Sequence, residues 1–456
     1  MAKDRAGIID TFIKTRAEEL RDGVVIDKSA YDDYNVKRGL RNSDGTGVTV
    51  GITRIGNVRG YYIENGEPIP AEGELTYRGI DVAELVRGFT ADERPGFEET
   101  AYLLLFGQLP DARSLEEFRA ILAEYRLLPN KFFEDMILAA PSKNIMNKLS
   151  RSVLALYSYD DEPETFGRTI EDELDKAIRL IARCPVIVAN AFAAKRHYFD
   201  NDGLHLRRSR AELGTAENFL NLIRQDGSYT AAEARLLDLC FVLHAEHGGG
   251  NNSAFACRVL SSAGTDIYSA IAAAVGSLKG ARHGGANERV ADMLSMVASD
   301  VADWTSEDEV REYLHRVLRK EAGLGDGLIY GMGHAIYTLS DPRAVMLKAM
   351  ARELAVEKGM REEFDLIESV ERLTPSVFQE AGRGSKPLCA NVDMYSGFVY
   401  RMLGIPRELY TPLFAVARMA GWCAHRVEEA WGNGKIMRPA YKAITKETAY
   451  TPLGAR

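Results

Sequence analysis

Apolar residues recur at helical spacing along most of this 456-residue chain. From Gly79 onward, apolar positions three or four residues apart predict successive helices, separated by turns at proline and glycine. Residues 5–21 share this spacing and predict an amphipathic helix that packs on the body of the protein or on a partner chain; its apolar side carries Ile8, Ile9, Phe12 and Ile13. The pattern as a whole predicts a mostly α-helical fold.

Residues 41–78 depart from this spacing. Short apolar runs there are separated by glycine and polar residues, which is typical of strands, and Glu64-Asn65-Gly66 has the composition of a hairpin turn. We therefore expect a small N-terminal β-hairpin region on an otherwise helical chain.

Two helical patterns between residues 243 and 290 end in a histidine that is followed by glycine. His247 continues the apolar stripe of the first helix, which residues 248–250 then stop, so a polar group stands where a hydrophobe is due. His283 comes at or just before the N-terminus of the next helix. Unpaired N–H groups and the helix dipole disfavour imidazolium there, so we expect a neutral ring that can donate a hydrogen bond to a carbonyl oxygen. Either histidine, taken alone, is better explained by a structural role.

Composition narrows the class of protein. With 46% apolar and 27% charged residues this is an ordinary globular chain, and its formal net charge of −9 argues against a general nucleic-acid or anionic-membrane surface. The five cysteines are scattered without a CxxC pair, which indicates neither a disulfide framework nor a cysteine zinc site. There is no secretory signal pattern and no run of about 18 apolar residues. We expect no membrane segment and a reducing, cytoplasmic location.

Two further segments could carry chemistry. Gly331-Met332-Gly333-His334 places a histidine in a loop whose glycines let the backbone approach a ligand closely, although a turn histidine is an equally good explanation. Asp341-Pro342-Arg343 has the pattern of a helix start, with Asp as the cap and Pro as the first residue. Arg343 is then either a surface arginine or an anion clamp.

Asp393 and Arg418 complete the candidate set. Asp393 precedes a helix and suits either a cap or a catalytic carboxylate. Arg418 lies on a largely apolar helix face, and no acidic residue lies within one helical turn to pair with it. A bound anion would supply the missing partner.

The sequence disfavours three other kinds of site. His244-x-x-His247 has no third metal ligand at typical spacing. The chain contains neither a G-x-x-x-x-G-K-[ST] phosphate loop nor a G-x-S-x-G nucleophile elbow, and residues 323–333 lack the preceding strand of a dinucleotide fingerprint.

The candidate residues lie in motifs that together resemble the citrate synthase family. These motifs follow the family's order over most of the chain: TYRGIDVAEL (76–85), FEETAYLLLFGQLP (97–110), LHAEHGGGN, GARHGGAN, GMGHAIYTLSDPR, NVDMYSG, FAVARMAG and MRP. The resemblance implies a mostly α-helical homodimer without metal or tightly bound cofactor. A large domain (1–283 plus 398–456) and a small domain (284–397) would close over oxaloacetate and acetyl-CoA.

The resemblance also implies a role for each candidate residue. Asp393 would remove a proton from the acetyl methyl, neutral His283 would donate a hydrogen bond to the thioester carbonyl, and His334 would hydrogen-bond the ketone of oxaloacetate. The residues that would hold the substrate carboxylates are His247, Arg343, Arg418 and, from the partner subunit, Arg438. Those that would contact CoA are Gly331, Gly333 and Lys386.

Three functions fit these residues. The first is a citrate synthase, which condenses acetyl-CoA with oxaloacetate and water. The second is a 2-methylcitrate synthase that uses propionyl-CoA, because one methylene changes discrimination by only about 1 to 3 kcal/mol. The chain departs from the family's usual pattern at Tyr330, Met332 and Met394-Tyr395, which shape the acyl pocket and the CoA loop. The third, a non-catalytic CoA or carboxylate sensor, is disfavoured because His283, His334 and Asp393 are all present.

Overall fold

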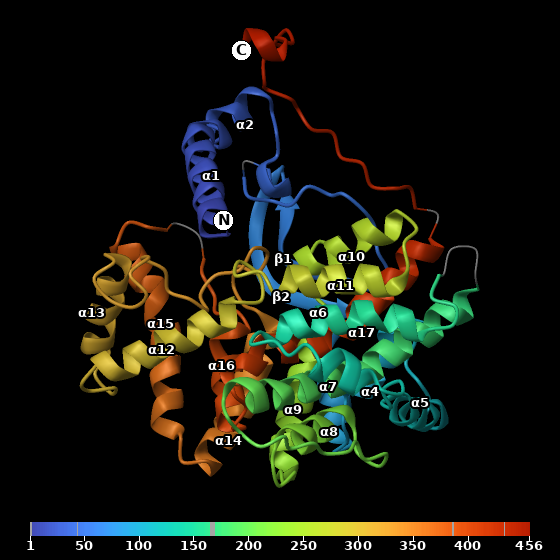
Figure 1. The fold of residues 1–456 in the computed structure, drawn as a ribbon. Helices are drawn as coiled ribbons and strands as arrows, with labels where there is room; N and C mark the ends of the chain where they lie inside the picture. The colour runs from blue at the N-terminus through green and yellow to red at the C-terminus, as the bar shows by residue number, and fades with distance from the viewer. Residues whose placement is uncertain (1, 43, 165–168, 385–386, 433) are drawn as a thin grey trace. The chain divides into compact units, whose positions relative to one another are not determined.

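The structure, a computed structural model, describes residues 2–42, 44–164, 169–384, 387–432 and 434–456 (Figure 1). The chain forms two compact units. One consists of residues 1–51 with 438–456, and the other of residues 52–437.

The first unit contains both ends of the chain. It holds α1 (Ala2–Val24), α2 (Ser29–Asp33), the 3-10 turn η1 (Arg38–Leu40) and, in the C-terminal tail, the 3-10 turn η5 (Leu453–Ala455). The ammonium of Lys442 in the tail lies 5.3 Å from the ring centroid of Tyr34. Helix α1 confirms the helix predicted for residues 5–21, and its apolar side is exposed: Ile8 keeps 64% and Phe12 63% of its accessible surface.

A three-stranded antiparallel sheet opens the second unit. Strands β1 (Gly56–Glu64), β2 (Glu67–Tyr77) and β3 (Ile80–Asp81) lie in that order. Asn65 and Gly66 both have positive φ and form the two-residue hairpin turn that the sequence predicts. The register of β1 against β2 shifts between Arg59 and Tyr61, which is a bulge at Gly60.

The β region is shorter than the sequence predicts. In the described part of residues 41–55 no strand forms, and only one isolated bridge joins Arg41 to Gly47. The backbone N–H of Arg54 does not pair with a strand but donates to Glu428 Oε1 at 2.7 Å. A carboxylate from a distant helix has therefore replaced the strand partner that the apolar pattern alone would predict.

Helices make up most of the second unit, which confirms the mostly α-helical prediction. They are α3 (Val82–Ala91), α4 (Phe97–Phe106), α5 (Ala112–Tyr125), α6 (Ile145–Ala155), α7 (Ile170–Phe199), α8 (Thr215–Ile223), α9 (Ala231–His244), α10 (Asn252–Ser262), α11 (Ile267–Leu278), α12 (Ala286–Asp300), α13 (Glu307–Leu318), α14 (Pro342–Glu357), α15 (Arg361–Glu380), α16 (Asp393–Met402) and α17 (Tyr410–Trp431). Short helical turns lie at Phe133–Leu138 (η2), Leu156–Tyr159 (η3) and Arg407–Leu409 (η4).

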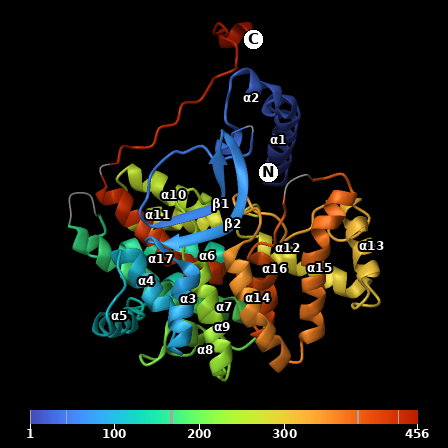
Figure 2. The same cartoon turned by 180° about the vertical axis from the view of Figure 1, so that it is seen from behind.

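The helices of this unit form two groups (Figures 1 and 2). Helix α17 packs on α4, α7, α9 and α10, whereas α12 to α16 pack chiefly on one another. The groups meet where α14 contacts both α9 and β2, and where α16 contacts α9. The division into a large domain (1–283 plus 398–456) and a small domain (284–397) stays a prediction.

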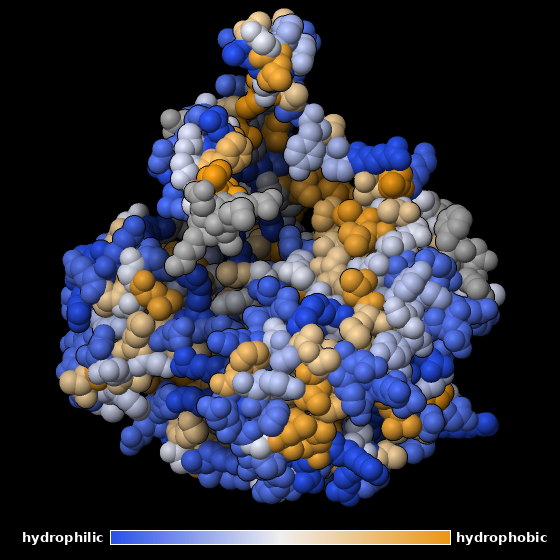
Figure 3. Space-filling view, viewed as in Figure 1, coloured by the Kyte–Doolittle hydropathy of each residue, from blue (hydrophilic) through white to orange (hydrophobic). Residues whose placement is uncertain are grey.

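Burial accounts for the apolar composition of helix α7, and all five cysteine thiols are buried as well. Among the described residues, α7 alone is long and apolar enough to cross a membrane, but 72% of its most apolar window is buried within the protein, as in a core helix. On the face seen in Figure 3, polar side chains predominate and apolar ones are interspersed. The cysteines are free and buried: Cys184, Cys240, Cys257, Cys389 and Cys423. Burial raises the pKa of Cys257 to about 12 and that of Cys389 to about 11.

Candidate active site

His247 lies in the turn that follows α9. The helix ends at His244, three residues earlier than the apolar stripe predicts, and Gly248 at φ +80° turns the chain away. The side chain of His247 is only 7% exposed, yet its Nε2 has no hydrogen-bond partner among the described residues. A buried polar atom without a partner indicates a place where a ligand binds.

Arg418, on α17, is the second buried group of this kind. It is fully buried, its Nε donates to His244 O at 2.5 Å, and its guanidinium carbon lies 4.7 Å from the ring centroid of Phe414. Neither Nη1 nor Nη2 has a hydrogen-bond partner in the described structure. Burial lowers the pKa of Arg418 to about 10, and the carboxylate of Glu246 opposes that shift, so the side chain is cationic at neutral pH. An anion would satisfy both free nitrogens, as the sequence predicts.

Arg343, in the first turn of α14, is the third buried group of the site. Asp341 caps α14 and Pro342 is its first residue, which confirms the predicted helix start. Arg343 is 4% exposed and forms a two-pronged ion pair with Asp341, with Nε to Oδ1 at 3.0 Å and Nη2 to Oδ2 at 2.7 Å. The backbone N–H of Val392 also donates to Asp341 Oδ2, at 3.2 Å. One buried carboxylate thus holds Arg343 beside the segment that leads into α16.

Asp393 is the first residue of α16 and does not cap it. Its backbone N–H donates to Asn391 Oδ1 at 3.0 Å, so Asn391 fills the role that a capping aspartate would have had. Burial raises the pKa of Asp393 to about 6; the charge of Arg343 and a hydrogen bond from Asn287 lower it, and Asp341 raises it further. A carboxylate with a pKa close to the working pH suits a general base.

His283 is neutral in this structure. Burial, with the charge of Arg418, lowers its pKa to about 4. Its Nε2 lies 3.1 Å from Ser253 Oγ, which also accepts from Trp422 Nε1 at 3.1 Å. The ring precedes α12, where the sequence predicts a neutral imidazole.

His334 lies in a loop that pairs with the approach to Asp393. Gly331 and Gly333 have φ of +84° and +88°, and Met332 forms a bridge with Ala390. The Nδ1 atom of His334 accepts hydrogen bonds from the backbone N–H groups of residues 336 and 337, both at 3.1 Å. Because Nδ1 accepts, the proton of the neutral ring is on Nε2, which is therefore a donor.

Electrostatic contacts show which predicted residues the fold brings together. Burial is the main cause that lowers the pKa of His247, and electrostatic interactions with Arg343, His334, Arg418 and His283 lower it further. His247 therefore lies within reach of residues from α14, α17 and two loops. Asp393 joins this cluster through Arg343. The imidazole rings of His247 and His334 are 5.0 Å apart between centroids.

The remaining predicted residues have different outcomes. Gly331 and Gly333 shape the His334 loop, and their contact with CoA stays a prediction. Lys386 lies outside the described residues. Arg438 belongs to the first unit, where its side chain is exposed, and its role in a partner subunit's site stays a prediction.

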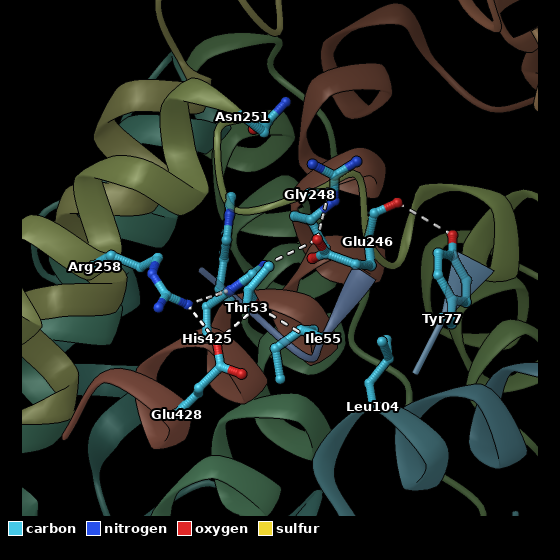
Figure 4. A network of polar contacts seen from close by, with 12 residues as sticks. Thr53, Ile55, Tyr77, Leu104, Glu246, Gly248, Asn251, Arg258, His425 and Glu428 are labelled. Carbon is cyan, nitrogen blue, oxygen red and sulfur yellow. Dashed lines mark hydrogen bonds and ion pairs between the residues drawn. The ribbon is translucent and has the colours of Figure 1, made fainter. Parts of the chain in front are cut away.

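A second buried network, which the sequence did not reveal, includes Glu246, the residue before His247 (Figure 4). Glu246 Oε1 accepts from His425 Nε2 at 2.9 Å and from the backbone N–H of the residue after His247. His425 Nδ1 in turn accepts from Arg258 Nη1 at 2.9 Å, and Arg258 pairs with Glu428 at 2.7 Å. Since its Nδ1 accepts from Arg258, the hydrogen that His425 donates to Glu246 is on Nε2. A signal was available: His425 lies two turns after Arg418 on the same helix face, and Glu246 directly precedes His247.

Comparison with known proteins agrees with this geometry. A family model described as "Citrate synthase, C-terminal domain" matches residues 44–440. The chain belongs to the citrate synthase family. It is accordingly an enzyme, an acyltransferase of the citrate synthase type, and its mostly helical fold is that of the family.

Individual members of the citrate synthase family resemble this chain over nearly its full length. The citrate synthase of Synechocystis is 34% identical over 431 residues, which cover 93% of this chain and 95% of that protein. The 2-methylcitrate synthase 1 of Corynebacterium glutamicum is 32% identical over 404 residues, 87% of this chain and 96% of that protein. The crystal structure of citrate synthase from Pyrobaculum aerophilum matches with a TM-score of 0.73 at 31% identity, covering 90% of this chain and 94% of that one.

The described residues also bear on the disfavoured metal site. No group of three or more His, Cys, Asp or Glu residues in the described part of the chain could hold a metal ion. The Nε2 atom of His244 is already engaged, because it lies 3.0 Å from the Tyr400 hydroxyl. The pair His244 and His247 therefore does not form the facial ligand set that its spacing alone would allow.

Proposed function

We propose that this enzyme condenses acetyl-CoA with oxaloacetate and water to give citrate and CoA. The observation that carries the proposal is the buried cluster of unpaired donors at Arg418 and His247, which fits a small dianion beside a base, Asp393, and two neutral histidines. The substrates themselves are inferred from the family.

Substrate binding is the first step that these residues support. The guanidinium groups of Arg343 and Arg418, with His247, would hold the two carboxylates of oxaloacetate, and Arg geometry suits such recognition. In a homodimer, Arg438 of a second copy would add a further cation. Gly331, Gly333 and Lys386 would contact CoA, which acts as a co-substrate and not as a tightly bound cofactor. We also propose a cytoplasmic location, because the five cysteines are free thiols, as is usual in a reducing compartment.

Enolisation comes next. The Asp393 carboxylate takes a proton from the acetyl methyl, and the C–H electron pair forms the enolate, whose negative oxygen is stabilised by a hydrogen bond from His283. A neutral imidazole is matched to this task, because it donates without presenting a fixed charge. The low pKa of His283 keeps it neutral over the whole physiological range.

Condensation and hydrolysis complete the reaction. The enolate carbon attacks the ketone carbon of oxaloacetate, and the ketone oxygen takes the proton of His334 Nε2. The proton held by Asp393 restores neutral His334. Water then hydrolyses the thioester of citryl-CoA, which yields the third carboxylate, the CoA thiol and one proton. Closure of the site around the substrates would keep water out until that step.

A thiol-release assay tests the proposal. Purified protein is given oxaloacetate with acetyl-CoA, and Asp393→Asn is compared with the natural enzyme. We expect kcat to fall about 10²- to 10⁴-fold while oxaloacetate affinity, measured by calorimetry, is retained. Unchanged thiol release in Asp393→Asn would show that another group is the base.

A second acyl substrate is favoured by one comparison. The 2-methylcitrate synthase relative is nearly as similar to this chain as the citrate synthases are. Comparing kcat/KM for acetyl-CoA and propionyl-CoA in the same assay decides between the two, and a higher value for propionyl-CoA would replace citrate by 2-methylcitrate as the product. Absence of thiol release with any acyl-CoA would leave the sensor function instead.

A further inference from the structure

The loop between His334 and Arg343 lies against the β1–β2 hairpin. The Thr338 hydroxyl donates to Gly60 O at 2.5 Å, and Ser340 Oγ accepts from the backbone N–H of Gly73 at 3.1 Å. Ser340 Oγ also donates to Glu72. Side chains of the loop thus bond both the backbone and one side chain of the hairpin.

Two glycines make this contact possible. A Cβ at Gly60 would lie 2.5 Å from the carbonyl oxygen of Ile336, and a Cβ at Gly73 would collide with Ser340 O and with the ring of Tyr337. Neither glycine has positive φ, so their missing side chains, and not their backbone angles, are what the fold requires. The loop backbone is therefore seated directly on the hairpin backbone.

Tyr337, in the middle of this loop, is packed on His334. The two rings stack at 4.6 Å between centroids and 27° between planes, and the Tyr337 ring also lies 5.6 Å from the His247 ring, at 75° between planes. The backbone N–H of Tyr337 is one of the two donors to His334 Nδ1. The Tyr337 hydroxyl is buried and has no hydrogen-bond partner among the described residues. The ring and the backbone of Tyr337, not its hydroxyl, contact the histidine.

We propose that Tyr337 is a positioning residue that fixes the orientation and the tautomer of His334, and that the β1–β2 hairpin seats it. This proposal rests on the proposed function, in which His334 Nε2 is the proton donor. If the ring of Tyr337 were lost, the imidazole could tilt or exchange tautomers, and Nε2–H would no longer point at the ketone. A misplacement of this kind affects the chemical step more than it affects binding of the oxaloacetate carboxylates.

A matched pair of variants separates the ring from the hydroxyl. Tyr337→Phe keeps the stack, whereas Tyr337→Leu removes the aromatic ring and keeps an apolar side chain. We expect Tyr337→Phe to keep kcat within about twofold, and Tyr337→Leu to lower kcat about 10- to 100-fold with a change in KM for oxaloacetate of less than about threefold. Equal kcat for the two variants would overturn the proposal, whether both are active or both are impaired.

A second measurement does not depend on turnover. The imidazole ¹⁵N shifts of the chain's 8 histidines report which ring nitrogen carries the proton, and the His334 signals are identified by their loss in His334→Gln. In the natural enzyme and in Tyr337→Phe we expect the Nε2–H tautomer alone; in Tyr337→Leu we expect shifts averaged between tautomers. An unchanged His334 spectrum in Tyr337→Leu would refute the positioning role of Tyr337, whether or not the natural enzyme releases thiol. Absence of thiol release in the natural enzyme would refute the proposed function alone.

The hairpin is tested by substitutions outside the site. Gly73→Ala should lower kcat in the same direction as Tyr337→Leu, whereas Gly88→Ala, on α3 with open space around it, should leave kcat unchanged. Thr338→Val removes the hydroxyl that bonds Gly60, and Thr338→Ser restores it. If Gly73→Ala does not fold, the two Thr338 variants are compared instead. Equal kcat and equal His334 shifts in Thr338→Val and Thr338→Ser would show that the hairpin does not position Tyr337.

Discussion

Two sets of buried charges lie side by side in this enzyme, and they differ in how they are satisfied. Arg418 and His247 face the candidate substrate site with donor atoms that have no partner among the described residues. We call these residues the substrate-facing layer. In the second set, the paired layer, Arg258 bonds His425, Glu428 and, at 2.9 Å, Glu429.

A buried charge without a protein partner is suited to binding a ligand, whereas a paired buried charge supports the fold. Burying a cation without a partner costs several kcal/mol, so a site that keeps one must recover that energy elsewhere. For Arg418, binding of the substrate dianion would recover this free energy. The paired layer recovers its energy in the free protein, and through Glu246 it fixes the turn on which His247 lies.

Removing Arg418 should have the largest effect on activity. In Arg418→Leu, we expect kcat/KM for oxaloacetate to fall about 30- to 4000-fold, because the loss of a charge that pairs with a buried carboxylate costs about 2 to 5 kcal/mol. The free energy of unfolding without substrate should stay the same or rise, because an unpaired buried charge has been replaced by a hydrophobe. Steady-state kinetics and urea unfolding check both parts. A clear loss of stability would mean that Nη1 and Nη2 of Arg418 already have partners in the free enzyme.

The same substitution elsewhere on α17 should give the opposite pattern. Arg426 is 2% exposed and pairs with buried Glu173 at 2.8 Å. Arg426→Leu leaves that carboxylate alone, so we expect the free energy of unfolding to fall by about 3 to 5 kcal/mol while KM for oxaloacetate is little changed. If Arg426→Leu and Arg418→Leu were equally destabilised, the distinction between buried charges with and without a protein partner would be wrong.

Lower pH should act on the substrate-facing layer. Protonation of Asp393, whose pKa is raised to about 6, predicts that kcat/KM falls about tenfold per pH unit below pH 6, whereas His283 stays neutral down to about pH 4. In Asn287→Ala, which removes a hydrogen bond that lowers the pKa of Asp393, this limb should move to higher pH. A pH–rate profile of both proteins tests the assignment, and a limb that does not move would point to a different base.

Stability follows the same two groups with opposite signs. The raised pKa of Asp393 stabilises the folded state below its unfolded pKa, and that contribution is lost as pH rises through about 6. The lowered pKa of His283 contributes stability above its unfolded pKa, and that contribution is lost as pH falls towards about 4. Since the two oppose each other between pH 4 and 6, the rate profile is the sharper measurement.

The smallest effect should come from the outer end of the paired layer. Thr53 Oγ1 donates to Glu428 Oε2 at 2.6 Å, but Thr53 is exposed and Glu428 keeps its bonds to Arg258 and to the backbone of Arg54. Thr53→Val should therefore lower the free energy of unfolding by about 1 kcal/mol or less, and Thr53→Ser should restore it. Thermal unfolding checks the pair; a loss well above this value would show that Thr53 organises the network.

Sequence spacing predicted the features that depend on neighbours along the chain. Helical periodicity predicted α1, Asn65-Gly66 predicted the hairpin turn, and Asp341-Pro342 predicted the start of α14. Each of these is decided by a few adjacent residues.

Contacts across long stretches of chain could not be predicted in this way. Glu246 and His425 are 179 residues apart, and the apolar face of α17 gave no sign of the carboxylate that comes from another helix end. Asp341 illustrates a different limit: its cap role was predictable, but its ion pair with Arg343 and its bond to Val392 depend on how α14 meets α16. The stack of Tyr337 on His334 likewise requires the hairpin to be in place.

The burial of all five cysteines determines how turnover can be followed. Released CoA is a solvent-exposed thiol, which a disulfide reagent titrates quickly, whereas a buried thiol with a raised pKa is nearly inert. The folded enzyme should therefore add almost nothing to the colour that the product generates. On heating, five protein thiols become reactive at once, so a single reagent in one cuvette reports catalysis below the melting temperature and unfolding above it.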